Sequence, residues 1–238
     1  LTIVCFMIAL IQGEDWHWDS TKIITLFIAS ALGFILFFIS QFVNKAPLIN
    51  LNLFKSRPFT ASCITYAIIQ LSFMTQVFLT ITLQKSYGMS PVMAGLANLP
   101  TVLFYVLIGP RVGKLYDKVW ARLPIGFGLL GLCVSFLWLG FTLPYHHYWY
   151  IFPGLLLMGL SFPFITTPTM AMGLAAVSPE QRGSASAIIA CIRQLGGAMG
   201  VGGIGAIIAG FQLPLMHLGV NKNHAYSLAT GNTFLIVA

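Results

Sequence analysis

The chain has 238 residues, of which 58% are hydrophobic and only 7% are charged, and its net charge is +7. Nearly all of the charges fall in short gaps between apolar runs of roughly 20 residues, the length that crosses the hydrocarbon core of a bilayer as a helix. Because only helices and closed barrels satisfy the backbone inside a bilayer, this composition excludes a soluble fold and predicts an all-α polytopic membrane protein.

Eight apolar segments follow one another along the chain. They are Leu1–Gln12, Ile23–Val43, Phe59–Gln84, Pro91–Val112, Leu123–Leu143, Trp149–Val177, Ser186–Phe211 and Thr233–Ala238. The first segment lacks its start and the last lacks its end, so we expect the sequence to be part of a longer protein.

These segments predict three parts. Residues 1–43 form a transmembrane hairpin whose first helix is truncated, and residues 44–58 form a cytoplasmic linker with Asn, Pro and Lys. Residues 59–238 form a transmembrane bundle of five full spans and the first turns of a sixth, expected to begin at Thr233.

The Lys and Arg residues of the loops are unevenly distributed, which predicts the orientation of the chain. One alternate set of loops holds eight of them: Lys45, Lys55, Arg57, Arg111, Lys114, Lys118, Arg122 and Arg182. The other set holds three: Lys22, Lys85 and Lys222. Since cytoplasmic loops are enriched in Lys and Arg, we expect the first set inside the cell. The positive charge is thus explained by topology, and we expect no nucleic-acid partner.

No pattern in the sequence predicts catalysis. Each of the four cysteines lies within a predicted span, without the spacing of a metal site, and is interpreted as a small apolar residue. The adjacent pair His146 and His147 cannot share one helix face as metal ligands do, and is interpreted as solvated. We therefore expect no enzyme, no catalytic residue, no metal site and no organic cofactor.

Four departures from plain apolar helix carry functional hypotheses. The first is the tight cytoplasmic loop Gly113–Arg122, where Asp117 is the only acid among bases. A carboxylate there can accept charge-assisted hydrogen bonds or face a helix N-terminus. The alternative is a basic loop that only sets topology.

The second is Arg193, about seven residues into the span that follows the loop Ser178–Glu180. A charge inside the bilayer is a functional-site hypothesis, and the alternative is an arginine that reaches back to the cytoplasmic interface. The third is a glycine-rich stretch on the same span, in which Gly196 and Gly200 form a GxxxG pair. Such residues serve close packing or, alternatively, a hinge.

The fourth is a set of polar side chains within the spans, which should face the bundle interior or a watery cavity. The candidate substrate-lining residues are Tyr66, Gln70, Gln76, Asn98 and Thr166. Pro163 and Pro168 flank Thr166 and are expected to break that helix. A cavity of this kind suits amphipathic organic molecules, and the alternative is hydrogen bonding between helices.

These motifs resemble those of the major facilitator superfamily. In the loop 113–122, Gly113, Asp117, Lys118 and Arg122 are in register with the family's GxLxDRxGxR motif, and Trp120 replaces its second glycine. Residues 87–96, 179–186, 193–197 and 51–59 are similar to stretches of the fourteen-helix drug:proton antiporters. The resemblance implies a C-terminal six-helix bundle preceded by an extra helical hairpin.

The same resemblance implies a function. We expect a proton-coupled multidrug efflux transporter that exports amphipathic compounds across a bacterial inner membrane by alternating access. The proton is the coupling ion, its carboxylates are expected in the N-terminal half, and a periplasmic adaptor and an outer-membrane channel are possible partners. The alternatives are an exporter of a native metabolite, such as a lipid or siderophore, and a non-transporting sensor or scaffold.

Overall fold

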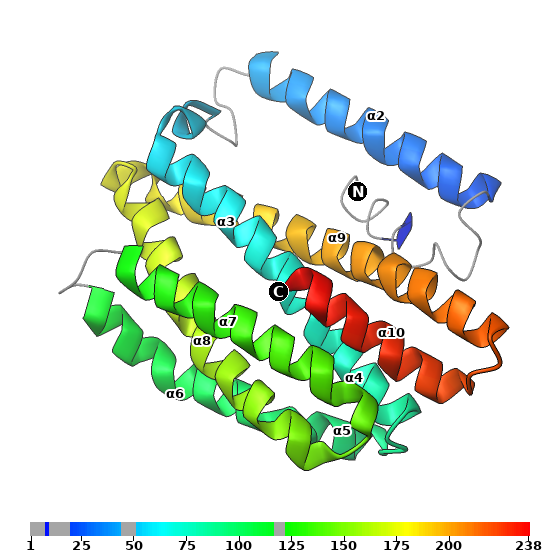
Figure 1. Cartoon of the computed structure of the whole chain (residues 1–238). Coiled ribbons are helices and arrows are strands. Elements are labelled where there is room, and N and C mark those ends of the chain that lie inside the picture. The colour runs from blue at the N-terminus through cyan, green and yellow to red at the C-terminus, as the bar shows by residue number, and fades with distance from the viewer. Residues whose placement is uncertain (1–7, 10–19, 44–50, 117–121) are drawn as a thin grey trace. The chain divides into compact units, whose positions relative to one another are not determined.

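The computed structural model describes residues 8–9, 20–43, 51–116 and 122–238, and Figure 1 labels its helices. Every regular element within these residues is helical. The α-helices are α2 Thr21–Val43, α3 Arg57–Phe73, α4 Thr75–Lys85, α5 Pro91–Ala97, α6 Leu99–Tyr116, α7 Arg122–Thr142, α8 Tyr148–Ala175, α9 Arg182–His217 and α10 Lys222–Val237. The short 3-10 turns are η1 Leu51–Lys55, η2 Leu143–Tyr145 and η3 Pro179–Gln181.

Five helical stretches are long and apolar enough to cross a bilayer. They are Arg57–Lys85, Pro91–Leu115, Leu123–Tyr145, Tyr148–Ala175 and Pro179–Met216. Large apolar side chains on them are exposed, such as Phe141 (65%) and Leu130 (67%), as lipid-facing residues are. The expected all-α polytopic fold is confirmed. Of the predicted hairpin 1–43, most of the first helix lies outside the described residues.

Two of the predicted continuous spans contain a break. The span Phe59–Gln84 is divided at Met74 into α3 and α4, where the Thr75 hydroxyl bonds the Ser72 carbonyl at 2.6 Å. The next span is divided at Asn98, which is the C-cap residue of α5. A hydroxyl or amide that competes for backbone partners favours such irregularities, and apolar periodicity does not reveal them.

The expected break at Pro163 and Pro168 is wrong, because α8 runs without interruption from Tyr148 to Ala175. Its hydroxyl groups bond carbonyls one turn back: Ser161 to Leu157 at 2.6 Å, Thr166 to Phe162 at 3.0 Å and Thr169 to Ile165 at 2.6 Å. Serine and threonine side chains, together with neighbouring helices, make proline tolerable inside membrane helices.

The last helix begins earlier than predicted, at Lys222 rather than Thr233. The Asn221 side chain caps it by accepting from the Asn223 N–H at 3.1 Å. Its first turns are polar, so hydropathy alone assigns them to a loop. In the structure they are helical, and Ala225, Ser227 and Ala229 on them are fully buried.

The chain divides into two compact units. The first unit comprises residues 1–71 and 173–202, and the second comprises residues 72–172 and 203–238. In the first unit α9 approaches α3 closely. A Cβ added at Gly196 would lie 2.5 Å from the Ala67 carbonyl oxygen, so only glycine fits there.

In the second unit α10 packs against α7, α4 and η2. Figure 1 shows α10 beside α7 and α4. The helices α7 and α10 meet at Gly140 and Gly231, where a Cβ added at Gly231 would lie 2.8 Å from the Gly140 carbonyl oxygen. The rings of Phe136 and Phe234 pack edge to face beside this crossing, with centroids 5.4 Å apart. Lipid is as apolar as a leucine side chain, so packing of this kind holds membrane helices together.

Candidate functional site

A line of polar contacts joins α5 and α6 to α8 in the second unit, and we call it the α6–α8 seam. At one end the Tyr148 hydroxyl donates to the Ala97 carbonyl at 3.0 Å. One turn further, the buried Thr101 hydroxyl donates to the Leu155 carbonyl, also at 3.0 Å. Gly159 follows on α8, against the Thr101 backbone. The two helices therefore run in the same direction at close range.

The seam continues to the candidate residue Thr166. Its hydroxyl lies 3.4 Å from the Tyr105 hydroxyl of α6, and it donates to the Phe162 carbonyl of its own helix. Tyr105 is 40% exposed and Thr166 is half-buried. Unlike the Thr101 contact, this pair is accessible, so a molecule that reaches it meets two hydroxyl groups among apolar side chains.

A second polar contact is centred on the candidate residue Asn98. Its side-chain amide donates to the Thr80 hydroxyl of α4 at 3.0 Å and to the Ala94 carbonyl at 2.9 Å. Thr80 in turn donates to the backbone carbonyl of the candidate Gln76 at 2.9 Å. The structure therefore brings Asn98 close to the turn of α4 that carries Gln76, across the α4–α5 hairpin.

The Asn98 side-chain oxygen is buried and has no hydrogen-bond partner among the described residues. An unpaired buried acceptor costs about 1–3 kcal/mol. Such a cost favours any conformational change or molecule that brings a donor to this oxygen. Because Asn98 also ends α5, the donor would act where the helix is already interrupted.

Two candidate lining residues belong to the first unit. Tyr66 and Gln70 lie one turn apart on α3, with Tyr66 buried and Gln70 half-buried. Gln76, Asn98 and Thr166 belong to the second unit.

The family resemblance predicts that Gly113, Asp117, Lys118 and Arg122 form a gating motif, and the structure describes this motif only in part. Asp117 and Lys118 lie outside the described residues, and α7 begins at Arg122. Gly113 is half-buried on α6, and a Cβ added to it would lie 3.7 Å from Thr167, an ordinary contact distance. Among the described residues, the packing of α6 therefore does not require glycine at position 113.

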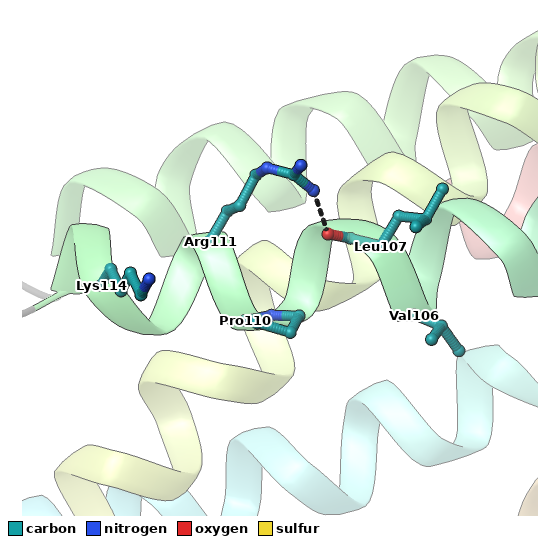
Figure 2. A pocket seen from close by; sticks show the side chains of 5 residues that line it. All are labelled: Val106, Leu107, Pro110, Arg111 and Lys114. Atoms are coloured by element: carbon teal, nitrogen blue, oxygen red, sulfur yellow. Dashed lines mark hydrogen bonds between the residues drawn. The ribbon is translucent and has the colours of Figure 1, made fainter.

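An open pocket of about 370 Å³ lies beside the C-terminal half of α6. Figure 2 shows the side chains that line it, from Val106, Leu107, Pro110, Arg111 and Lys114. The Arg111 guanidinium turns back along the helix and donates to the Leu107 carbonyl at 2.6 Å. At 3.6 residues per turn, these positions share the face of α6 opposite Thr101 and Tyr105. The pocket is therefore separate from the seam.

The remaining candidates lie on α9 in the first unit. Gly196 and Gly200 are buried, and Gly196 is the residue that approaches α3. Arg193 is exposed on the same helix.

The sequence Ser178-Pro179-Glu180 before α9 is typical of a helix N-cap, with proline and an acid in the first turn, but the structure differs from this expectation. The Ser178 side chain makes no capping hydrogen bond. The Ser178 hydroxyl donates to the Glu180 carboxylate instead. The pKa of Glu180 is lowered, first by the backbone N–H of Glu180 itself and then by this Ser178 contact and the charge of Arg182. The exposed carboxylate is therefore ionised at neutral pH.

One polar cluster was not predicted. His146, interpreted from the sequence as solvated, lies 2.9 Å from His224 of α10. The two residues are 78 positions apart, so no local pattern indicates that they meet. The sequence signal was limited to the presence of histidine in two loops of the same set.

Comparison with known proteins agrees with this architecture. Residues 1–201 match the profile of the Major Facilitator Superfamily. The chain is 28% identical over 202 residues to "Multidrug resistance protein Stp" of Mycobacterium tuberculosis, covering 84% of this chain and 37% of that protein. It is 27% identical over 204 residues to "Multidrug export protein EmrB" of Escherichia coli K12, covering 81% and 38%.

A third relative is "Multidrug resistance protein 3" of Bacillus subtilis, 30% identical over 206 residues that cover 84% of this chain and 40% of that protein. The chain thus spans about two fifths of the length of these relatives, between 37% and 40%. The resemblance predicted from the sequence motifs is confirmed. With helices that can span a membrane and a match over residues 1–201, the chain belongs to the Major Facilitator Superfamily.

Proposed function

We propose that this chain is the C-terminal portion of a proton-coupled multidrug exporter of a bacterial inner membrane. Residues 1–43 form its extra hairpin, residues 44–58 a cytoplasmic linker and residues 59–238 its C-terminal bundle. The observation that carries the proposal is the similarity to three proteins named for multidrug export or resistance, over 81–84% of the chain.

The character of the polar contacts supports this proposal. The accessible Tyr105–Thr166 pair and the unpaired Asn98 oxygen lie in helices that are otherwise apolar. Neutral hydrogen-bonding groups on an apolar wall favour amphipathic molecules over strongly charged or sugar-like ones. Within the second unit, we propose that the substrate contacts Thr166, Asn98 and Gln76. Tyr66 and Gln70 of α3 stay candidate lining residues on their sequence pattern alone.

The motion we propose is alternating access, in which this bundle rocks against the rest of the protein. Asp117 latches the outward-open state through contacts outside this chain, and proton import drives the cycle. The predicted spans hold no Asp or Glu, so we place the proton-binding carboxylates in the part of the protein that this chain does not include. A periplasmic adaptor and an outer-membrane channel are proposed partners.

The function is tested with the full-length protein in cells that lack their own drug exporters. Cells are loaded with a fluorescent amphipathic cation, and its loss is followed after energy is restored. The proposal predicts faster loss than in cells with an empty vector, and retention of the dye when the proton gradient is collapsed. A well-expressed, membrane-inserted protein that exports no member of a panel of amphipathic compounds would contradict it.

A further inference from the structure

Three segments of the second unit meet at the imidazole of His146. This residue caps the C-terminal end of η2, just before α8. Among the described residues other than glycine, it is the one with a positive φ, at 53°. Its Nδ1 atom lies 3.2 Å from the Ser86 carbonyl, in the turn that follows α4. Its Nε2 atom lies 2.9 Å from His224 Nδ1 and 3.2 Å from the Ser227 hydroxyl, both on α10.

The contacts around this imidazole fix how many protons it can share with His224. A carbonyl only accepts, so Nδ1 of His146 carries a proton and donates to Ser86. In the neutral pair, His146 Nε2 then accepts from His224 Nδ1–H. With one extra proton, Nε2–H donates to His224 Nδ1 and the hydrogen bond survives. With two, both nitrogens carry N–H groups that point at each other across 2.9 Å.

The surroundings of the pair oppose the second proton. Lys85 of α4 lies over the Tyr226 ring of α10, with Nζ 4.9 Å from its centroid, and Lys222 begins the same helix. His224 lies in the first turn of α10, where the helix dipole disfavours a cation. The described residues of the second unit include no Asp or Glu that would offset the charge.

Tyr87 is a further ionisable neighbour of the pair, and its ring centroid lies 5.4 Å from that of His146. Burial raises the pKa of Tyr87 to about 12. Its hydroxyl therefore stays protonated and donates to the Leu143 carbonyl at 3.0 Å. The exposed His147 contacts the Tyr150 ring instead, with centroids 5.4 Å apart. His146 and His224 are thus the pair whose protonation changes the contact.

We propose that His146 and His224 form a protonation site that fastens the start of α10 to the turns after α4 and before α8. The site holds one extra proton without loss and releases α10 when both imidazoles are charged. The Ser86 hydroxyl, which donates to the Asn223 carbonyl at 2.6 Å, belongs to the same fastening. This inference concerns the response of the fold to pH and does not depend on the proposed transport activity.

The direction of the effect follows from the proton count. The fastened state binds fewer protons at low pH than the released state, so its stability is present at neutral pH and lost on acidification. Imidazole is the side chain that changes charge between pH 5 and 8. One proton of difference makes the equilibrium constant for release rise by up to about tenfold per pH unit.

Hydrogen exchange on the full-length protein in lipid nanodiscs tests this. Exchange of the backbone amides of residues 225–230 is followed from pH 8 to pH 5, corrected for the intrinsic rate at each pH. We expect protection to fall below neutrality with a slope that approaches tenfold per pH unit. In His224→Gln and in His146→Gln the slope should vanish. The matched control His147→Gln removes an exposed neighbouring histidine and should keep the wild-type slope.

Each of three results would overturn the proposal. One is a flat protection profile in the wild-type protein, which decides the matter even if a variant does not fold. Another is a His224→Gln protein that keeps the wild-type slope, because the titrating group would then lie elsewhere. A slope lost only in His147→Gln would also overturn it.

Discussion

Gly159 of α8 lies directly against the backbone of Thr101 of α6. A Cβ added at position 159 would fall 2.5 Å from the Thr101 carbonyl oxygen and 2.8 Å from its Cα. The Thr101 hydroxyl bonds the Leu155 carbonyl one turn earlier on α8. This crossing sets the distance between the two helices that carry Tyr105 and Thr166, so it positions the accessible part of the seam.

Replacement of Gly159 by valine should separate these helices. The added methyl groups meet backbone atoms, which cannot rotate away, and overpacking of this kind costs about 1–3 kcal/mol. We expect a lower Tm of the purified full-length protein in nanodiscs. The control is Gly126→Val on α7, since a Cβ at Gly126 meets no atom within 4 Å. Equal stability of the Gly159→Val and Gly126→Val proteins would contradict the described crossing.

Removal of the Thr166 hydroxyl should change substrate preference without loss of expression. Thr166→Ala removes one of two accessible hydroxyl groups from the seam. We expect the export rate of hydrogen-bonding compounds to fall relative to the export rate of purely apolar cations. We expect the same result for Gln76→Ala and for Gln70→Ala. Thr142→Ala is the matched control, because its hydroxyl makes the same one-turn bond, to Trp138, at the end of α7. Wild-type export rates for every compound in all three lining variants would refute the assignment.

Substitution of Asp117 tests the proposed latch. Asp117→Asn is nearly isosteric, so the protein should insert and fold while the charge is lost. A charge-assisted hydrogen bond contributes about 1.5–3 kcal/mol, so the balance between the two states should shift by about 10- to 100-fold toward the inward-open state. Cross-linking across the cytoplasmic side and an efflux assay would measure this.

The control for the latch is Glu180→Gln, which removes an exposed acid from another loop that is predicted to be cytoplasmic. It should leave efflux and cross-linking unchanged. Full efflux in the Asp117→Asn protein, with unchanged cross-linking, would reduce the loop 113–122 to a topology signal.

The predicted orientation is tested by labelling single cysteines in intact cells with an impermeant maleimide. The structure joins Ser86, His146 and Asn223 by hydrogen bonds, so positions 86, 146 and 222 must lie on one side of the membrane. The Lys and Arg distribution places that side outside and position 118 inside. Labels at 86, 146 and 222 but not at 118 are expected. Labelling at position 118 alone would show that the orientation is the reverse of the predicted one.

The spans were predictable because charges are costly in a bilayer, so the apolar runs between Lys85 and Arg182 mark the helices directly. The start of α10 could not be predicted in this way, because its first turns are polar. They are helical because Asn221 caps them and because α10 packs on α7. The breaks at Met74 and Asn98 also escaped prediction, since they depend on hydroxyl and amide contacts rather than on periodicity.

Sequence reasoning selected polar residues of the site but not their partners. Asn98 and Thr166 stood out as polar groups in apolar spans, yet their contacts with Thr80 and Tyr105 depend on how the helices pack. The His146–His224 contact joins two loops 78 residues apart, and no spacing rule connects them.

The most direct test of the proposed function is transport by the purified full-length protein in proteoliposomes. A pH gradient, acidic on the side that corresponds to the cell exterior, is imposed while the movement of an amphipathic fluorescent cation is followed. The account predicts that the cation moves toward the acidic side, that the movement stops when nigericin collapses the gradient, and that it is strongly reduced in the Asp117→Asn protein. Movement that is equal with and without the gradient, or absent from a folded protein for all compounds tested, would contradict it.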